Sequence, residues 1–293
     1  MHIDFNPVMI QGTTKLLGVI GYPVEHSLSP VMHNAAIANL GENYVYLPFP
    51  VPPDELTTAL AGFAAIGVQG FSVTIPHKQT IIPLLSEVST VAQSIGAVNT
   101  VWRKQEGWGG TNTDVVGFIA PLQAYDVDWN SKKVVILGNG GAARAVVAGC
   151  AQLECCEIHV VGRNCEKLAA FQTSWQHSPM AVSLQVHLWE QLPALIANAD
   201  LLVNTTPVGM FPNANQSPVE EIVMEQLKPG TIVYDLIYRP SPTQFLKFAE
   251  VRGAITIDGL EMLVQQGASA LELWLKQPVP IDIMRTSVQQ QLE

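Results

Sequence analysis

Residues 71–78, FSVTIPHK, place groups that could transfer a proton at the end of an apolar segment. The segment begins as a strand, which Pro76 must end near Ile75 because proline lacks a backbone N–H and interrupts a sheet ladder. Ligands of open α/β sheets bind beyond the carboxyl ends of the strands. Lys78 is therefore either a solvated charge at the start of a helix or a group that handles a proton. The residue pattern alone favours the solvated charge, although a cation is mildly unfavourable at a helix N-terminus.

A second stretch, residues 134–153 (VVILGNGGAARAVVAGCAQL), has the pattern of a buried strand, a glycine turn and a helix. Gly138, Gly140 and Gly141 would let the backbone approach a pyrophosphate, which binds the free N–H groups of a helix N-terminus. The spacing is GxGGxxxA rather than GxGxxG, and Ala145 is the small residue that lets helix and strand pack closely. The apolar strand before the turn and the apolar helix after it favour dinucleotide binding over a tight structural turn.

The end of the next apolar segment indicates which dinucleotide would bind. NAD sites carry an acidic residue near this strand end for the ribose 2′-hydroxyl, whereas NADP sites use arginine for the 2′-phosphate. Here the segment EIHVVG is followed by Arg163 and Asn164, with no acidic residue at its end. A guanidinium group offers a planar fork suited to phosphate. The sequence therefore favours NADP, with a surface arginine in a loop as the alternative.

These groups need a scaffold, and short apolar segments alternate with helical patterns along the whole chain. A first series has the order β-α-β-α-β-α-β and ends in a strand, a polar turn around Gln105–Gly107 and a short return, and a second series begins near Asp114. We therefore predict an α/β fold of two lobes with mostly parallel sheets, the second lobe Rossmann-like, with a cleft between them. In the first helix, Ser29 is predicted as the N-cap, Pro30 occupies the first helical position and Gly41 ends the helix.

The composition excludes several classes of protein. Of 293 residues, 48% are hydrophobic and only 14% are charged, which is enough apolar material for a large core. The net charge of −10 argues against a nucleic-acid partner, because phosphate backbones bind basic faces. The four cysteines have no metal-ligand spacing, and no secretory signal or long apolar run is present. We therefore expect a cytoplasmic protein with reduced thiols, no bound metal and no membrane span.

Eight motifs spread over almost the whole chain resemble the shikimate dehydrogenase family. They are SLSP (27–30), SVTIPHK (72–78), AVNT (97–100), GTNTD (110–114), GNGGAARA (138–145), NTTPVGM (204–210), YDLIY (234–238) and DGLEMLVQQGA (258–268). None is decisive alone, but together and in the order of the family they are specific. The resemblance implies NADP-linked, reversible reduction of 3-dehydroshikimate to shikimate in aromatic amino-acid biosynthesis. It implies a substrate-binding domain (1–113 plus 262–293) and a Rossmann-like NADP-binding domain (114–261), and leaves monomer and homodimer both open.

The resemblance also assigns the site residues. In the family the lysine of PHK pairs with the aspartate of GTNTD, so Lys78 and Asp114 are the implied catalytic pair; from the sequence alone Asp114 would be a helix N-cap. The residues implied to bind the substrate are Ser27 and Ser29 for its carboxylate, Thr74, Asn99, Tyr238 and Gln266 for its hydroxyls, and the pair Lys78 and Asp114. The residues implied to bind NADP are Gly138, Asn139, Gly140, Gly141, Ala142, Arg163, Asn164, Thr205, Met210 and Gly259. Among these, Met210 is implied to lie near the nicotinamide ring, and Gly259 to offer it a backbone contact.

Five further polar residues need an interpretation. Asn99 lies in an apolar segment and, if buried, needs hydrogen-bond partners. Ser72 stands where the family usually has asparagine, which predicts one shorter or water-bridged contact. His77 is interpreted as a wall of the site rather than a base, and His26 and His33 as surface or packing residues.

Three alternative functions fit less of the sequence. A quinate/shikimate dehydrogenase that uses NAD would have an acidic residue after EIHVVG, and none is present. A methylenetetrahydrofolate dehydrogenase does not explain SLSP or SVTIPHK. A non-catalytic nucleotide-sensing protein predicts loss of Lys78 or Asp114, and both are present.

Overall fold

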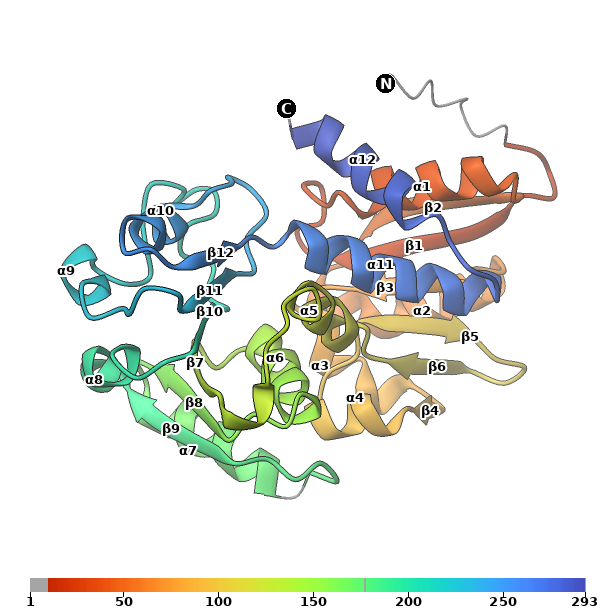
Figure 1. The fold of residues 1–293 in the computed structure, drawn as a ribbon. Coiled ribbons are helices and arrows are strands. Elements are labelled where there is room, and N and C mark those ends of the chain that lie inside the picture. The colour runs from red at the N-terminus through yellow and green to blue at the C-terminus, as the bar shows by residue number, and fades with distance from the viewer. Residues whose placement is uncertain (1–9, 177, 293) are drawn as a thin grey trace. The chain divides into compact units, whose positions relative to one another are not determined.

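The computed structural model describes residues 10–176 and 178–292, which divide into two compact units (Figure 1). The first unit runs up to Thr113 and resumes at Val264, and the second extends from Asp114 to Leu263. Each unit has its own six-stranded sheet with helices around it. The predicted fold class, α/β with two mostly parallel sheets, is confirmed.

The sheet of the first unit has the strand order β2-β1-β3-β5-β6-β4. Its strands are β1 (Lys15–Gly21), β2 (Tyr44–Pro50), β3 (Gly70–Val73), β4 (Glu87–Val88), β5 (Thr100–Arg103) and β6 (Trp108–Thr111). β1 is parallel to both β2 and β3, whereas β5 runs antiparallel to β3 and to β6. A polar turn closed by the bond from Lys104 N–H to the Gly107 carbonyl joins β5 and β6, as predicted. The short strand β4 was not predicted from the sequence.

The helices of the first unit cover this sheet and include the end of the chain. They are α1 (Ser29–Leu40), α2 (Leu56–Ala65), α3 (His77–Thr80), α4 (Thr90–Ile95) and α12 (Ile281–Leu292), with 3-10 turns at Pro53–Glu55 and Ile82–Leu84. Helix α11 (Leu260–Leu275) begins in the second unit and ends in the first. Its Trp274 donates a 2.9 Å hydrogen bond to the Val101 carbonyl of β5 and leaves no room for a side chain at Gly70 of β3. Helix α11 therefore packs directly against the first sheet.

The N-terminus of α1 differs from the prediction. The helix begins at Ser29 itself and Leu28 is the N-cap, so the predicted capping role of Ser29 is wrong and Pro30 is the second helical residue, not the first. The Ser27 hydroxyl, two residues before the predicted cap, accepts the Ser29 N–H at 3.3 Å. At the other end, Gly41 adopts φ = +67° and closes the helix as predicted.

The second sheet is fully parallel, with the strand order β12-β11-β10-β7-β8-β9. Its strands are β7 (Lys133–Leu137), β8 (Glu157–Gly162), β9 (Leu184–Leu188), β10 (Leu201–Asn204), β11 (Ile232–Asp235) and β12 (Ile255–Ile257). Its helices are α5 (Asp114–Leu122), α6 (Gly141–Gln152), α7 (Cys165–Gln176), α8 (Leu192–Ile196), α9 (Glu221–Met224) and α10 (Gln244–Val251), with 3-10 turns at Trp129–Ser131 and Trp189–Gln191. β7 pairs with β8 on one side and β10 on the other, so the strand order reverses beside β7. Such a reversal is where doubly wound sheets bind ligands.

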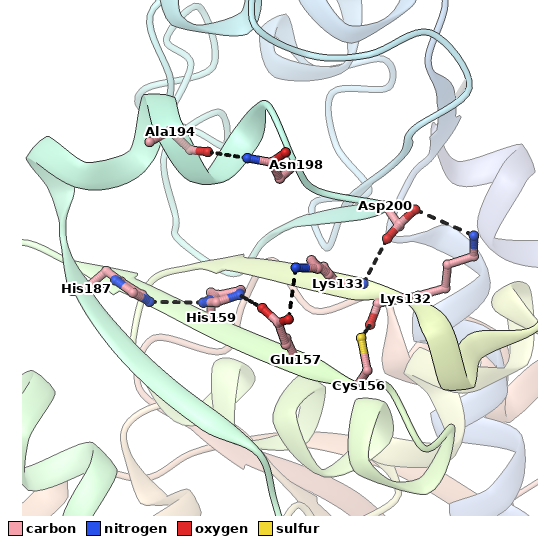
Figure 2. A network of polar contacts seen from close by, with 9 residues as sticks. All are labelled: Lys132, Lys133, Cys156, Glu157, His159, His187, Ala194, Asn198 and Asp200. Atoms are coloured by element: carbon pink, nitrogen blue, oxygen red, sulfur yellow. Dashed lines mark hydrogen bonds and ion pairs between the residues drawn. The ribbon is translucent and has the colours of Figure 1, made fainter.

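A row of polar contacts crosses β7, β8 and β9 (Figure 2). Lys133 forms a 2.9 Å ion pair with Glu157, whose other oxygen lies 3.1 Å from His159 Nε2. His159 Nδ1 lies 3.0 Å from His187 Nε2. Burial and the neighbouring His159 lower the pKa of His187. His159 is buried, whereas Lys133, Glu157 and His187 are partly exposed, and ion pairs between exposed side chains add little to stability.

The described residues contain neither a membrane-spanning helix nor a cluster of metal-ligating side chains. Within residues 10–176 and 178–292, no helix combines the length and apolar character needed to cross a membrane. The same residues contain no group of three histidine, cysteine or acidic side chains arranged to hold a metal ion. All four cysteines are free, with Cys150 and Cys155 buried and Cys156 and Cys165 exposed.

The contact between α5 and α6 yields a stability prediction. A Cβ atom at Gly149 of α6 would lie 2.5 Å from the buried Phe118 ring of α5, whereas one at Gly62 of α2 would meet nothing within 4 Å. We expect Gly149→Ala to lower the free energy of unfolding by about 1–3 kcal/mol through overpacking. Gly62→Ala should instead raise it by about 0.5–1 kcal/mol, because alanine is the better helix former. Urea denaturation of both variants measures the difference, and equal effects would contradict the close α5–α6 contact.

Candidate active site

Several of the polar residues expected to bind substrate lie at one edge of the first sheet, whereas Tyr238 and Asp114 belong to the second unit. Thr74 follows β3, and its N–H donates to the Ile20 carbonyl of β1 at 2.9 Å. Its methyl group would lie 2.4 Å from a Cβ at Gly21, so the ends of β1 and β3 are close together. Because β5 is antiparallel to β3, the residue before β5 lies at the same edge. The residues that follow β1 and β3 therefore lie close to the residue that precedes β5.

Asn99, the residue before β5, is the best-connected side chain of this edge. It is 2% exposed, and its Oδ1 accepts the N–H of Thr113 at 2.7 Å and the hydroxyl of Thr100 at 2.9 Å. Its Nδ2 donates to Thr113 Oγ1 at 3.0 Å and lies 3.4 Å from Gln266 Oε1 on α11. The expected need of this amide for partners is confirmed. Two predicted site residues, Asn99 and Gln266, are thus in contact although 167 positions apart.

A tyrosine that sequence reasoning missed contacts Ser29, the first residue of α1. Tyr46 of β2 donates its hydroxyl to Ser72 Oγ at 2.8 Å and also hydrogen bonds to the Ser29 side chain. Burial raises the pKa of this phenol. Ser72, which departs from the family's asparagine, therefore has a partner inside the protein. Nothing in the sequence distinguished Tyr46 from an ordinary core residue of an apolar strand.

The two histidines near this edge are buried packing residues. The His33 ring stacks on Tyr46 with ring centroids 4.1 Å apart, and burial lowers the pKa of His33 to about 4. His77 Nε2 lies 2.7 Å from the Val51 carbonyl, and the residue is 1% exposed. His77, the first residue of α3, is therefore held inside the protein against Val51, and its interpretation as a wall of the site stays a prediction.

Lys78 follows His77 in α3 and is partly exposed. Its carbonyl accepts the N–H of Val98 at 2.7 Å, directly before Asn99. Asn99 in turn holds Thr113, and Asp114, the first residue of α5, comes next in the chain. The backbone of Lys78 and the residue before Asp114 are thus linked through Val98 and Asn99. Both Lys78 and Asp114 make further interactions.

In the second unit, the glycine loop follows β7 at the point where the strand order reverses. Gly138 has φ = +100°, and a Cβ there would meet Thr205 Oγ1 at 2.9 Å, so the fold itself requires glycine. The Thr205 hydroxyl donates to the Leu137 carbonyl at 2.7 Å, which ties β10 to this loop. Gly140 and Gly141 have nothing within 4 Å of a Cβ position and no positive φ. Protein packing therefore leaves open space beside these two glycines at the N-terminus of α6, and their contact with a pyrophosphate stays a prediction.

The loop after β8 offers cations at the same edge of the sheet. Arg163 is exposed, and Asn164 Oδ1 accepts the Lys167 N–H at 2.8 Å, so Asn164 caps α7. Lys167, in the first turn of α7, is also exposed. Burial lowers the pKa of a third cation, Arg144, which lies over the Phe171 ring and donates to Ser174.

The loops after β10, β11 and β12 complete this edge. Met210 is 44% exposed in the loop after β10, and burial raises the pKa of the Tyr238 phenol after β11. Gly259 N–H donates to the Ile237 carbonyl at 3.1 Å, and a Cβ there would lie 2.1 Å from the Leu236 carbonyl oxygen. Glycine at position 259 is therefore required for the backbone after β12 to pass this close to the end of β11.

A buried carboxylate at the end of β11 was also missed. Asp235 is fully buried, and its Oδ1 accepts from Asn204 Nδ2 at 2.9 Å and from the Ile237 N–H at 3.1 Å. Its Oδ2 accepts the Thr243 hydroxyl at 2.6 Å. Burial raises the pKa of Asp235 to about 6, whereas the hydrogen bonds from these three donors favour the ionised carboxylate. An acidic residue inside the apolar segment YDLIY was the available signal.

Known families match the chain in three blocks. Residues 19–101 match Shikimate dehydrogenase substrate binding domain, residues 122–238 match Shikimate / quinate 5-dehydrogenase, and residues 259–289 match Shikimate 5'-dehydrogenase C-terminal domain. A curated relative from Nostoc sp., named shikimate dehydrogenase (NADP(+)), is 65% identical over 96% of this chain and 98% of its own. The chain belongs to the shikimate dehydrogenase family. The predicted resemblance is confirmed.

Solved structures of shikimate dehydrogenases share the whole fold. One, described as a complex with NADP+, superposes with a TM-score of 0.89 at 37% identity, covering 97% of this chain and 98% of that one. Another, from Thermus thermophilus in complex with NADP(H) and shikimate, has a TM-score of 0.83 at 32% identity, covering 95% of this chain and all of that one. The arrangement of two mostly parallel sheets is therefore that of shikimate dehydrogenases.

The Asn99 network yields a second prediction. We expect Asn99→Ala to lower the free energy of unfolding by about 1–3 kcal/mol, because the buried N–H of Thr113 and hydroxyl of Thr100 lose their acceptor. The control Asn198→Ala removes an exposed amide that bonds to the Ala194 carbonyl (Figure 2) and should change it by less than about 0.5 kcal/mol. Urea denaturation compares the two, and an equally small effect at Asn99 would contradict its role in the network.

Proposed function

We propose that this protein catalyses the reversible NADPH-dependent reduction of 3-dehydroshikimate to shikimate, a step of aromatic amino-acid biosynthesis. The observation that carries the proposal is the 65% identity, over 96% of this chain, with a relative named shikimate dehydrogenase (NADP(+)). The polar edge of the first sheet and the unexplained glycines of the second support it, because the reaction needs a site for a polyhydroxy acid and a site for a dinucleotide.

The chemistry divides between the cofactor and the chain. NADPH supplies the hydride when it is bound. The Lys78 ammonium group donates a proton to the alkoxide that forms at the substrate carbonyl and takes it back in the reverse direction. The Asp114 carboxylate pairs with this ammonium group and orients it. A lysine can perform this step because its proton moves readily between a charged amine and an oxygen anion beside it.

The substrate side chains are short polar groups suited to a carboxylate and several hydroxyls. We assign Ser27 and Ser29 to the carboxylate, since both lie where β1 leads into α1. We assign Thr74, Asn99, Gln266 and Tyr238 to the hydroxyls. The Asn99–Gln266 contact supports the assignment, because amides that hold each other are already oriented before the substrate arrives.

The cofactor residues come from the loops after β7, β8, β10 and β12. The pyrophosphate binds the N-terminus of α6 through Gly138, Asn139, Gly140, Gly141 and Ala142. Arg163 and Asn164 take the 2′-phosphate, and Thr205, Met210 and Gly259 lie along the nicotinamide half. We assign NADP binding to residues 114–261 and substrate binding to 1–113 with 262–293. Four free cysteines support a cytoplasmic location.

The Lys78 assignment is tested by shikimate oxidation. We expect Lys78→Met to reduce kcat by about 100-fold or more, as loss of general acid–base catalysis does, while shikimate still binds. Reduced-cofactor absorbance gives the rate, and calorimetry gives the dissociation constant of shikimate. Lys104→Met, at a surface lysine paired with Glu87, is the control and should leave both unchanged. Equal losses of rate and binding at Lys78 would make it a positioning charge instead.

The cofactor preference is tested at Arg163. We expect Arg163→Ala to raise the KM for NADP by about 10- to 100-fold, the value of a charge-assisted hydrogen bond to phosphate, without weakening the use of NAD. Arg252→Ala, whose guanidinium bonds the Glu225 carbonyl on the surface, serves as the control. Steady-state kinetics with NADP and with NAD measure the change in KM. The same assay with quinate in place of shikimate shows whether quinate is also oxidised. A parallel loss with NADP and NAD would show that Arg163 does not contact the 2′-phosphate.

A further inference from the structure

We propose that Asp235 is a positioning residue that fixes the shape of the loop formed by residues 204–210. The proposal rests on the function above, in which this loop flanks the nicotinamide half of NADP. Asp235 lies at the end of β11 and accepts hydrogen bonds from Asn204, Ile237 and Thr243. It acts through Asn204, the last residue of the neighbouring strand β10.

The carboxylate sets the orientation of the Asn204 amide. An ionised carboxylate only accepts hydrogen bonds, so the NH2 end of Asn204 must face Asp235. The carbonyl end of the amide then faces the loop, where Oδ1 accepts the Thr206 N–H at 3.0 Å and the Thr206 hydroxyl at 2.7 Å. Asn204 is fully buried, so water does not compete for either end. The Asp235 carboxylate thus determines that the loop must present hydrogen-bond donors to Asn204 Oδ1.

The rest of the loop follows from these bonds. The Thr206 hydroxyl also accepts the Val208 N–H at 3.3 Å, and Asn204 Nδ2 lies 3.3 Å from the Val208 carbonyl. Gly209 has φ = +111°, and a Cβ there would lie 3.3 Å from Ile237 and 3.8 Å from Thr243. Ile237 and Thr243 are the other two donors to Asp235. Both ends of the loop are therefore held by the same carboxylate and its partners, and exposed Met210 follows directly.

The proposal predicts that Asp235→Asn slows catalysis more than it weakens binding. Asparagine has one accepting and one donating end, so it cannot accept from Asn204, Ile237 and Thr243 together. We expect kcat to fall by about ten-fold, the value of one hydrogen bond to a charged group, with dissociation constants for NADP and shikimate within about two-fold of the wild type. A residue that only stabilises the fold would lower the unfolding temperature and leave kcat per folded molecule unchanged.

Two threonine variants complete the experiment. Thr206→Val removes the hydroxyl that links Asn204 to Val208 and should reproduce the effect on kcat; in the double variant with Asp235→Asn the losses should not add, because both act through one network. Thr231→Val is the matched control, since it removes a hydroxyl bond to the Ala199 carbonyl at the opposite end of β11. It should leave kcat unchanged. If Asp235→Asn does not fold, Thr206→Val alone decides, and wild-type kcat in that variant overturns the proposal.

Hydrogen exchange separates this proposal from the proposed function. Peptides covering residues 204–210 should exchange faster in Asp235→Asn and Thr206→Val than in the wild type or in Thr231→Val. This measurement reports the shape of the loop whether or not the protein oxidises shikimate. Wild-type protein without turnover would refute the function, whereas unchanged exchange in both loop variants would refute the role of Asp235.

Discussion

The direction of the chain in each sheet is the constraint on which the site depends. Parallel strands bring all their carboxyl ends to one edge, so the loops after β7, β8, β10, β11 and β12 meet at one edge of the second sheet. The first sheet achieves the same result by a different route. There β5 runs backwards, and the residue before a strand joins the residues that follow two others. Without that reversal Asn99 would lie at the far end of the sheet from Thr74.

Polar groups at these edges are buried, and each must be satisfied before it can serve a ligand. Asn99 is held by two threonines and a glutamine, and Asn204 by a carboxylate and a threonine. Networks of this kind fix side-chain orientation because a buried amide with the wrong end inward loses several bonds at once. These buried hydrogen bonds thus orient the side chains before substrate and cofactor bind.

Much of the fold was predictable from the sequence, because alternating apolar and helical segments determine an α/β structure. The glycine loop, the turn before β6 and the need of Asn99 for partners also followed from residue types. The cap of α1 did not, because Ser27 and Ser29 are chemically equivalent candidates and only the backbone decides between them. Tyr46, Asp235 and the contact of Asn99 with Gln266 depend on residues far apart in the chain, and no local pattern reports such pairs. The roles assigned to Lys78 and Asp114 came from the family resemblance, not from their spacing.

The chain passes from one unit to the other between Thr113 and Asp114 and returns between Leu263 and Val264. The second unit is therefore one continuous piece of sequence inserted into the first. During synthesis on the ribosome, residues 114–263 can complete their fold as soon as they have emerged. The first unit has to wait, because α12 packs on α1 and Trp274 bonds to β5 only when residues 264–292 have been made. Until then, the surfaces of α1 and β5 that these residues will cover stay exposed.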